Sequence, residues 1–477
     1  MRILHVGWGF RPWRGGGLIA YAEDVMEGQV RRGHDVAYLF AGRRYPLVRS
    51  PRLHRWRRRG VRMLELLSSP IAVGLDAGTR FPELELEEPA TEAALRRILR
   101  ARRPDVVHVQ ELTGLPSSVL EVARHESVPV VMTLQDYQAL CPTLKLYDSH
   151  GEICLRTQPG AECVICCRDA PADPVVMRGV TTAFEIERVT ARLPARTRAA
   201  ARHALTRVAQ AVGKPGQPSA GATSGGADRA AEYQRRRDVN LDRLSRVDAL
   251  VAMSSRVAEI HAGLGVDPDV LRTVPLTLAH LDRLSPRVIA EPPAPVRFVT
   301  LTGAQSEQKG AQVLLAAAEA LQAVGHTRGY VIDVYGPVDS GVRGGLERLP
   351  AVRLRGSYAG AEEIGSVLDG ADVGIVPSVW EEALAFVGLE LLAKGIPVIG
   401  NARGGIPDYT IPGQTGWLNR SCSGAELAEI MAGVIADPGQ VVRLNRSIRE
   451  RRDELVKPLE RHLDELDEIY REVLARD

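Results

Sequence analysis

Two glutamates stand eight residues apart in the C-terminal half of the chain, at Glu382 and Glu390. Hydrophobic periodicity places Glu382 in a loop after a strand and Glu390 in the helix that follows. A carboxylate so placed can accept hydrogen bonds from both hydroxyls of a ribose or sugar diol, while the N-terminus of the helix faces a pyrophosphate. The residues at that N-terminus are Ala383, Leu384, Ala385 and Phe386. The alternative is a pair of surface glutamates on an amphipathic helix.

A lysine and a glycine-rich loop supply further groups that suit an anion. Lys309 precedes a glycine between a strand and a helix of the second half. Near the N-terminus, residues 7–17 follow a strand and open a helix, so backbone N–H groups and a helix dipole converge there. Three consecutive glycines crowd this junction: Gly15, Gly16 and Gly17. The alternatives are an ordinary exposed lysine and a plain tight turn.

The glycine-rich loop is not the dinucleotide fingerprint. Its first two glycines, at positions 7 and 9, lack the third glycine three residues further on. The next strand ends without the acidic residue that binds a ribose in that fingerprint. The sequence therefore disfavours an NAD-dependent enzyme.

Cysteines gather in one segment of the first half, residues 137–170, which lacks helical and strand periodicity. Four of them, Cys141, Cys154, Cys163 and Cys166, have the spacing C-x(12)-C-x(8)-C-x(2)-C. Four thiolates, two of them on a C-x(2)-C knuckle, suit tetrahedral zinc at about 2.3 Å. We expect a structural zinc that orders this segment and takes no part in catalysis. Free buried thiols, an iron–sulfur cluster and disulfides are the alternatives.

Strands and helices alternate in both halves of the chain. In the first half, strands are expected at 3–7, 35–40, 106–109, 130–134 and 250–253, with helices at 18–32, 91–102 and 117–125. In the second half, strands are expected at 297–301, 331–335, 373–376 and 398–400, with helices at 310–324, 361–368 and 385–394. Short apolar strands separated by helices predict parallel strands joined by crossover helices.

This alternation predicts an α/β fold with two Rossmann-like doubly wound domains that face each other across a cleft, at whose edges ligands bind. Residues 1–290 form the first domain, with the cysteine-rich loop and a helical, low-complexity insert at 176–245. Residues 296–440 form the second, and 441–477 a C-terminal helical segment. The stretch AEPPAP at 290–295 is typical of a stiff linker. A long helix is expected at 180–212, and the segment 214–228 has the composition of a disordered loop.

Composition excludes some classes. The 477 residues include 61 basic and 59 acidic side chains, a formal charge of +2, so bulk nucleic-acid binding is not expected. No stretch approaches about 20 apolar residues, and the N-terminal one is too short for a signal peptide, which favours the cytoplasm. Nine arginines lie between Arg43 and Arg62. Such a run contacts anionic lipid or an acidic acceptor, or it is a solvated face.

The segment with Glu382 and Glu390 resembles the E-x(7)-E signature of retaining glycosyltransferase family 4, together with the G-x-P-V-I…G-G stretch that follows it. Residues 303–310 are similar to the G-R-x(4)-K-G loop of that family, with Ala304 where arginine is expected. The resemblance covers residues 1–175 and 247–438 and implies the GT-B fold. It also implies that Lys309 holds the pyrophosphate of a sugar donor.

Two segments of the first half, around His108 and Asp136, also look like family segments. The family implies histidine at the positions of Gln110 and Gln135, the second of which reaches the donor sugar. Glutamine can donate a hydrogen bond to a hydroxyl but carries no positive charge. Asp136 is expected either to orient neighbouring groups or to cap the local turn.

The resemblance implies a retaining hexosyltransferase, acting without a catalytic metal or cofactor in bacterial polysaccharide biosynthesis. Its donor would be a nucleoside-diphosphate sugar, and its acceptor a glycan, a lipid-linked sugar or a small molecule. Lys309 and the helix N-terminus would stabilise the leaving diphosphate, while Glu390 holds the ribose and Glu382 the sugar hydroxyls. Residues 15–17 would close over the phosphate from the other domain.

Two other classes stay open. A catalytically degenerate subunit that binds the donor and acts as a partner or activator is favoured by Ala304, Gln110 and Gln135. A sugar-nucleotide epimerase or phosphorylase on the same fold is the other, although the placement of the two glutamates favours neither reaction. The predicted site is Glu382, Lys309, Gln135 and Asp136 for catalysis, and residues 15–17, Lys309, 383–386 and Glu390 for donor binding.

Overall fold

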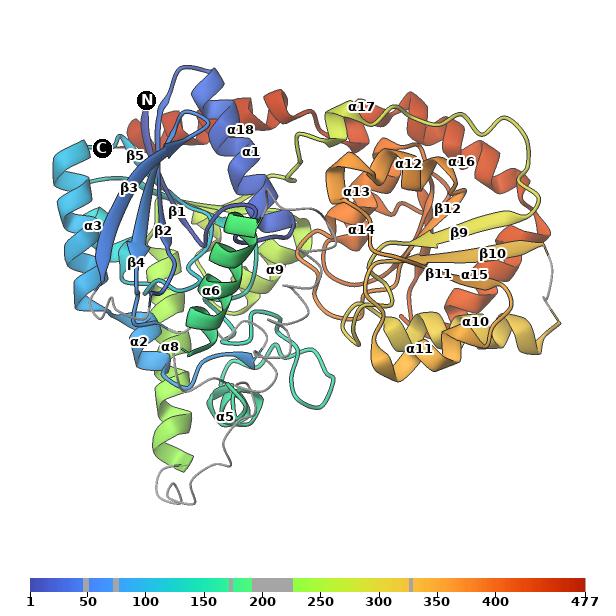
Figure 1. The fold of residues 1–477 in the computed structure, drawn as a ribbon, viewed down its shortest axis with the longest axis horizontal. Coiled ribbons are helices and arrows are strands. Elements are labelled where there is room, and N and C mark those ends of the chain that lie inside the picture. Colours follow the sequence, from blue (N-terminus) through green and yellow to red (C-terminus); the bar gives the residue numbers. More distant parts are fainter. Residues whose placement is uncertain (46–50, 72–76, 171–174, 191–225, 326–328, 477) are drawn as a thin grey trace. The chain divides into compact units, whose positions relative to one another are not determined.

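The computed structural model describes residues 1–45, 51–71, 77–170, 175–190, 226–325 and 329–476 (Figure 1). Internal contacts divide the chain into two units. Unit 1 comprises Met1–Val251, Ile260–Arg272 and Asp467–Asp477, and unit 2 comprises Ala252–Glu259 and Thr273–Leu466. The distal part of the expected helix at 180–212 and most of the expected loop at 214–228 lie outside the described residues.

This division differs from the boundary expected at residues 290–296. Residues 273–295 belong to unit 2, where the N–H of Arg287 donates to the carbonyl of Lys394 at 2.8 Å and that of Ile289 donates to the Asn445 side chain at 3.0 Å. The last residues of the chain belong to unit 1, where Tyr470 is fully buried. Backbone hydrogen bonds and burial therefore set the boundary, and the proline-rich stretch does not mark it.

Unit 1 is built on a sheet with the strand order β3-β4-β2-β1-β5-β6-β7-β8. Its strands are β1 Arg2–Gly7, β2 Asp35–Ala41, β3 Arg52–Arg58, β4 Val61–Leu67, β5 Val106–Val109, β6 Val130–Leu134, β7 Ala249–Ala252 and β8 Leu271–Thr273. β1 pairs in parallel with β2 and β5, β5 with β6, and β2 with β4, whereas β3 and β4 form an antiparallel hairpin. The sequence did not predict this hairpin.

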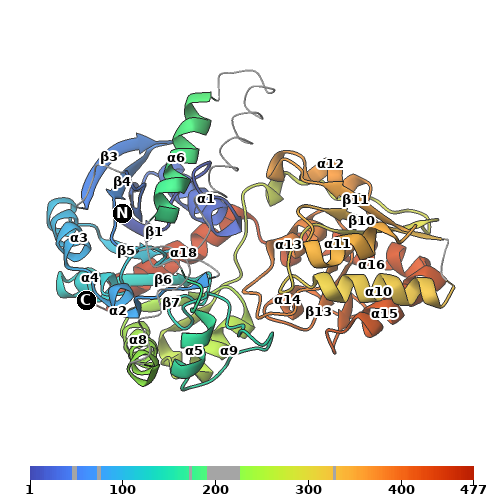
Figure 2. The same ribbon diagram turned by 60° about the horizontal axis from the view of Figure 1, so that its bottom comes forward.

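Helices cover both faces of the unit 1 sheet. They are α1 Gly17–Arg31, α2 Pro82–Leu86, α3 Pro89–Arg102, α4 Val119–His125, α5 Gly160–Cys166, α6 Val175–Thr190 and α8 Gly226–Ser245, with the ends of α9 Ser255–Gly263 and α18 Leu459–Leu474, both of which begin in unit 2. Figures 1 and 2 show α1 and α3 on opposite sides of the sheet. The apolar face of each helix packs on the strands, so Val25 of α1 and Leu95 of α3 are fully buried.

Unit 2 is built on a parallel sheet with the order β11-β10-β9-β12-β13-β14. Its strands are β9 Val296–Thr300, β10 Tyr330–Tyr335, β11 Val352–Gly356, β12 Val373–Val376, β13 Val398–Asn401 and β14 Gly416–Asn419. Its helices are α10 Ala311–Ala323, α11 Ser340–Glu347, α12 Ile364–Asp369, α13 Phe386–Ala393, α14 Ile406–Tyr409, α15 Gly424–Ala436, α16 Gly439–Glu450 and α17 Arg452–Leu455, together with the start of α18.

The core of unit 2 lies between its sheet and two long helices. Phe298 and Ile332 of the sheet pack there with Leu314 of α10 and Met431 of α15. α12 lies on the opposite face (Figure 1). The prediction of two Rossmann-like domains is confirmed. In the described part of the chain, no helix combines the length and the apolar character that a bilayer crossing needs.

Candidate functional site

Three loops meet at the carboxyl edge of the unit 2 sheet, after β9, β12 and β13. A Cβ on Gly310 would lie 2.0 Å from the carbonyl oxygen of Pro377, and one on Gly404 would lie 1.9 Å from that of Glu382. Both glycines have positive φ, 89° and 53°. The loops thus touch backbone to backbone, and only glycine at these two positions permits that approach.

The structure brings together Lys309 and Glu382, as the predicted site requires. The Lys309 ammonium donates to both carboxylate oxygens of Glu382, at 2.7 and 2.9 Å, and lies 5.3 Å from the ring centroid of Trp380. Glu382 is 7% exposed. An anion that binds Lys309 must therefore compete with Glu382 for the same ammonium group, and Glu382 is then free to accept other donors.

Glu390 is also at this edge, as the fifth residue of α13. Its carboxylate lies 2.8 Å from Nε2 of His280, a residue that the sequence analysis did not single out. Burial, with a smaller contribution from Glu390, raises the pKa of the Tyr358 hydroxyl. Because 110 residues separate His280 from Glu390, no local spacing signals this pair.

The start of α13 has the geometry of an anion-binding helix N-terminus. Ala385, just before the helix, adopts the left-handed conformation, φ 51° and ψ 74°, and no side chain caps the helix. The first N–H groups of a helix have no partner within it, so here they are available to a ligand. Left-handed backbone at alanine costs about 1 kcal/mol, a local strain of the kind that concentrates at functional loops.

Glu381, which the sequence analysis missed, has different hydrogen-bond partners from its neighbour Glu382. Its buried carboxylate accepts two hydrogen bonds from Arg256, at 2.9 and 3.2 Å, and one from the N–H of Gly404 at 3.0 Å. The hydrogen bonds with Glu381 raise the pKa of Arg256. The N–H of Gly405 in turn donates to the carbonyl of Glu382 at 2.7 Å. The hydrogen bonds of Glu381 thus hold in place the loop at Gly404, whose backbone contacts that of Glu382.

Ala304 stands where the family resemblance implies an arginine. It is fully buried in the core of unit 2, and its carbonyl accepts the N–H of Asp339 at 2.7 Å. An arginine in this position would have to leave the core. The packing therefore fits alanine, and Lys309 carries the positive charge of this loop.

At the carboxyl edge of the unit 1 sheet, Gln110 and Gln135 belong to one buried network. Nε2 of Gln135 donates to Oε1 of Gln110 at 2.8 Å, and Nε2 of Gln110 lies 3.1 Å from Nδ1 of His5. Nδ1 of His108 lies 2.6 Å from the Tyr470 hydroxyl, which also accepts a hydrogen bond from Gln29. Burial lowers the pKa of His5 to about 4.

The network decides which group Gln135 can offer to a ligand. Its amide nitrogen is already engaged, and its oxygen Oε1 is buried without a hydrogen-bond partner among the described residues. The sequence analysis expected a donor to a sugar hydroxyl. In this structure the free group of Gln135 is instead an acceptor.

Two acids lie beside this network, the half-buried Asp136 and the buried Glu111. Asp136 accepts the N–H of Gln138 at 2.9 Å, so it caps the local turn, and burial raises its pKa to about 6. Burial and the charge of Asp136 raise the pKa of Glu111, which is 2% exposed. The guanidinium of Arg14 stacks on Trp13 at 4.2 Å from its ring centroid. The sequence analysis missed Glu111 and Arg14, although both adjoin residues that it named.

The glycines of the N-terminal loop differ from one another. Gly16, which precedes α1, has a φ of 105°, a value that favours glycine, whereas Gly15 has an ordinary conformation. Both are exposed, and a Cβ on either would meet nothing within 4 Å. Gly17 begins α1. The turn accounts for Gly16, and the open surface at Gly15 leaves room for a ligand.

The cysteine-rich segment has a helix and a small core, which the sequence analysis did not expect. α5 packs on α8 so closely that a Cβ on Gly160 would lie 2.2 Å from the carbonyl oxygen of Ala230. Cys163 and Cys167 pack with Tyr233 of α8. The segment is therefore ordered by packing against a helix more than 60 residues further along the chain.

The four predicted zinc ligands lie in the described residues. Cys141 contacts the Thr143 hydroxyl at 3.2 Å, and Cys166 contacts the carboxylate of Glu162 at 3.8 Å. Nowhere in the described part of the chain do three or more His, Cys, Asp or Glu side chains form a group that fits a metal ion. This arrangement does not support the zinc site, which stays a prediction.

The arginine run at Arg43–Arg62 is only partly neutralised. Arg43 pairs with Glu65, Arg58 with Glu23, Arg59 with Glu27 and Arg62 with Asp35. Three arginines of β3 are exposed and have no acidic partner among the described residues: Arg52, Arg55 and Arg57. This edge strand therefore keeps an uncompensated positive charge.

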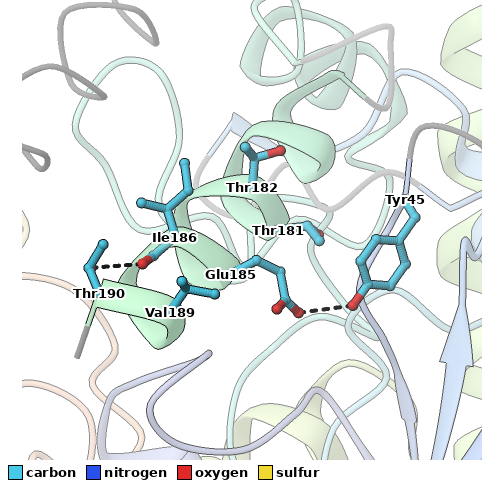
Figure 3. A pocket seen from close by; sticks show the side chains of 7 residues that line it. All are labelled: Tyr45, Thr181, Thr182, Glu185, Ile186, Val189 and Thr190. Carbon is cyan, nitrogen blue, oxygen red and sulfur yellow. Dashed lines mark hydrogen bonds between the residues drawn. The ribbon is translucent and has the colours of Figure 1, made fainter. Parts of the chain in front are cut away.

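A mainly apolar pocket of about 400 Å³ lies beside this run, between Tyr45 and α6 (Figure 3). The Tyr45 hydroxyl donates to Glu185 at 2.9 Å, and burial raises the pKa of Tyr45 to about 12. Glu185 also pairs with Arg43. The other lining residues, all on α6, are Thr181, Thr182, Ile186, Val189 and Thr190.

The fold defines a class, proteins with two Rossmann-like domains, and the loops at the carboxyl edges of both sheets carry charged or polar side chains. Residues 296–437 match the family "Glycosyl transferases group 1", and residues 16–159 match the family "Glycosyl transferase 4-like domain". The two matches together cover more than half of the chain. The chain therefore belongs to the glycosyltransferases of the GT-B fold.

Curated relatives match part of the chain. The protein assigned as colanic acid biosynthesis glycosyltransferase WcaL of Escherichia coli (strain K12) is 29% identical over 159 residues, 32% of this chain and 39% of that protein. The amylovoran biosynthesis glycosyltransferase AmsK of Erwinia amylovora is 29% identical over 147 residues, 29% of this chain and 35% of that protein. The chain thus matches about two fifths of the length of these relatives.

Solved structures share the whole fold. Sucrose-phosphate synthase from Thermosynechococcus elongatus superposes with a TM-score of 0.60 at 16% identity, over 100% of both chains. HepE of Anabaena in complex with UDP and glucose superposes with a TM-score of 0.55 at 12% identity, over 98% of both chains. At these identities the likeness describes the fold.

Proposed function

We propose that this chain is a retaining hexosyltransferase that uses a nucleoside-diphosphate sugar. The observation that carries the proposal is the Lys309 ammonium held against the Glu382 carboxylate, beside the uncapped start of α13. Glu390 stands one turn further along the same helix, with His280 on its carboxylate. A cation, a helix N-terminus, a carboxylate in the loop before the helix and a second carboxylate within the helix match a diphosphate flanked by a sugar and a ribose.

In the proposed donor complex, Lys309 and the first N–H groups of α13 bind the diphosphate. Glu382, displaced from Lys309 by the phosphate, accepts hydroxyl groups of the donor sugar. Glu390, oriented by His280, accepts the ribose diol. As the bond from the anomeric carbon to the diphosphate breaks, negative charge grows where these donors already point, which lowers the barrier. The acceptor oxygen attacks from the face that the diphosphate leaves, and its proton passes to a diphosphate oxygen.

We assign the acceptor to the carboxyl edge of unit 1. The free acceptor atom there, Oε1 of Gln135, and the carboxyls of the buried Glu111 and the half-buried Asp136 suit hydroxyl groups of a sugar. WcaL and AmsK carry names from bacterial polysaccharide biosynthesis, which supports a glycan or lipid-linked acceptor in such a pathway. The cytoplasm is the proposed location, with the unpaired arginines of β3 as the membrane contact.

The test is transfer by the purified chain, without added metal, from UDP-glucose, GDP-mannose and ADP-glucose to glycan, lipid-linked and small-molecule acceptors. UDP-glucose comes first because the similar HepE structure contains UDP and glucose. We expect acceptor-dependent release of the nucleoside diphosphate and an α-linked product by NMR. Glu382→Gln should abolish release, whereas the matched control Glu362→Gln, an exposed glutamate of the same unit, should leave it unchanged. Release unaffected by Glu382→Gln, or a β-linked product, would contradict the proposal.

A second candidate, a degenerate subunit that binds the donor without transfer, is favoured by two observations. Ala304 is fully buried where the family implies a phosphate-binding arginine, and the Gln135 nitrogen is engaged by Gln110. Gln135→His separates the candidates. An inactive wild type and an active Gln135→His variant would favour the degenerate subunit. An active wild type that the substitution slows would favour the transferase.

A further inference from the structure

Three neighbouring strands of unit 2 carry charged residues on one face. One face of β9, β10 and β11 packs on the core through Phe298, Ile332 and Leu354 respectively. Strands of a parallel sheet in α/β proteins are usually apolar on both faces, because helices cover both. Here the second face carries Arg297 on β9, Asp333 and Tyr335 on β10, and Arg353 and Arg355 on β11.

The register of the strands brings these charges together. Asp333 pairs with Arg353 on the adjacent strand, and its carboxylate accepts a hydrogen bond from Nε of Arg355 at 2.7 Å. The guanidinium groups of Arg297 and Arg353 have no acidic partner among the residues that the structure describes. Three arginines and one aspartate therefore leave an uncompensated positive charge on this face.

The same residues line a pocket of about 300 Å³. α12 borders it through Ser366 and Val367, and the chain just after the helix borders it through Gly370 and Ala371. Figure 1 shows α12 on this side of the sheet, opposite α10 and α11. The cluster is thus set in a hollow of the size that small ligands occupy.

The pocket is separate from the proposed donor site. Arg297 and Arg353 are the second residues of β9 and β11, and Ala371 precedes β12, so these residues lie toward the amino ends of the strands. Lys309 and Glu382 follow the carboxyl ends of β9 and β12, the edge at which open α/β sheets bind nucleotides. One anion cannot therefore occupy both places.

We propose that this pocket binds a phosphate monoester of the size of a sugar phosphate, through Arg297 and Arg353. A guanidinium group presents paired N–H donors that match two oxygens of a phosphate, and it stays charged at any physiological pH. Asp333 fixes Arg355 in place by its hydrogen bond. Tyr335 offers a hydroxyl to the rest of the ligand, while the Ser366 hydroxyl donates to the carbonyl of Glu363 at 2.8 Å and can accept a hydrogen bond from the ligand. This site goes beyond the proposed transfer reaction and does not depend on it.

The test measures binding of inorganic phosphate and of glucose 6-phosphate by calorimetry, at constant ionic strength. The full chain carries Lys309→Ala in every arm, which removes the other phosphate-binding cation. We expect saturable binding that the double substitution Arg297→Ala and Arg353→Ala weakens at least about tenfold for each arginine. Tighter binding of glucose 6-phosphate than of phosphate identifies the monoester, and equal binding of the two would overturn that part of the proposal.

Two further variants distinguish a specific loss of phosphate binding from the effects of a lower net charge or of impaired folding. The matched control, Arg343→Ala with Arg348→Ala on or next to the exposed surface of α11, removes the same charge from the same unit and should leave binding unchanged. Asp333→Asn removes the only acid of the pocket lining and should tighten phosphate binding. Equal weakening in the control pair, or no change in the Arg297 and Arg353 variant, would overturn the proposal.

Discussion

The adjacent glutamates Glu381 and Glu382 should respond differently to the same substitution. Glu381, with a side chain 4% exposed, accepts two hydrogen bonds from Arg256 and one from Gly404. A hydrogen bond to a charged group contributes about 1.5–3 kcal/mol, but Arg256 is 35% exposed, so solvent screening reduces its share to about half. Glutamine keeps one acceptor oxygen. We therefore expect Glu381→Gln to lower the free energy of unfolding of unit 2 by about 2 kcal/mol.

The Glu382 carboxylate accepts hydrogen bonds from the flexible ammonium group of Lys309, which is 27% exposed, and from no backbone N–H among the described residues. Such ion pairs contribute about 0–1 kcal/mol, so Glu382→Gln should leave stability almost unchanged. For a domain of this size, 1 kcal/mol moves the melting temperature by about 2–4 °C. Calorimetric unfolding should then show unit 2 melting about 4–8 °C lower in Glu381→Gln and within about 2 °C of wild type in Glu382→Gln.

For turnover, the two variants should rank in the opposite order from their ranking by melting temperature. Glu382→Gln removes the proposed partner of the donor sugar and should abolish turnover, whereas Glu381→Gln should keep measurable turnover below its melting temperature. A double-mutant cycle with Arg256→Gln provides the control, because contacting residues give non-additive losses. Equal melting temperatures for the two glutamine variants, or additive losses at Glu381 and Arg256, would refute the division of roles.

Four further predictions follow from individual contacts. Lys309→Ala should lower turnover about 10²–10³-fold by loss of a donor to the leaving group, and Lys309→Arg should restore most of it; steady-state rates that stay within a fewfold of wild type exclude this role. Burial lowers the pKa of His5 to about 4, so stability should fall as pH drops from about 6.5 to about 4, by up to about 3 kcal/mol, and urea unfolding of His5→Gln should lose most of that slope. Tyr470→Phe removes a hydroxyl that pairs with His108 and Gln29, which should cost about 2 kcal/mol in the same assay, and a loss below about 0.5 kcal/mol contradicts the network. Elemental analysis should find about one zinc per chain, lost on Cys163→Ser, if the predicted structural site forms, and metal-free protein with freely titrating thiols ends that prediction.

Local periodicity was sufficient for most of the buried strands and for most helices of the two units, although it missed the largely buried β4. β5, β6 and β12 have the bounds that the apolar runs predict, because a strand covered on both faces is continuously apolar. β3 and β11 escaped prediction for the opposite reason. Each alternates arginine with apolar residues, so neither forms an apolar run, and only pairing with β4 or β10 makes it a strand.

The resemblance to the family singled out Lys309, Glu382 and Glu390, whose roles stay a prediction, and the fold brings the first two into contact. Spacing could not assign different partners to Glu381 and Glu382, since adjacent side chains of a loop diverge according to what packs around them. Nor could it find His280, whose position against Glu390 depends on where a distant segment crosses the helix.

By itself, then, the amino-acid sequence determined the two α/β domains, the loops that follow their strands and the chemical types of the residues at those loops. The tertiary structure alone decided that the Gln135 nitrogen is engaged, that the cysteine-rich segment packs on α8, and that Arg297 and Arg353 share a pocket. The physical reason is the distance along the chain over which each kind of interaction acts. Hydrophobic periodicity acts over a few residues, whereas hydrogen-bond partners and buried charges depend on residues that only the completed sheet and its helices bring together.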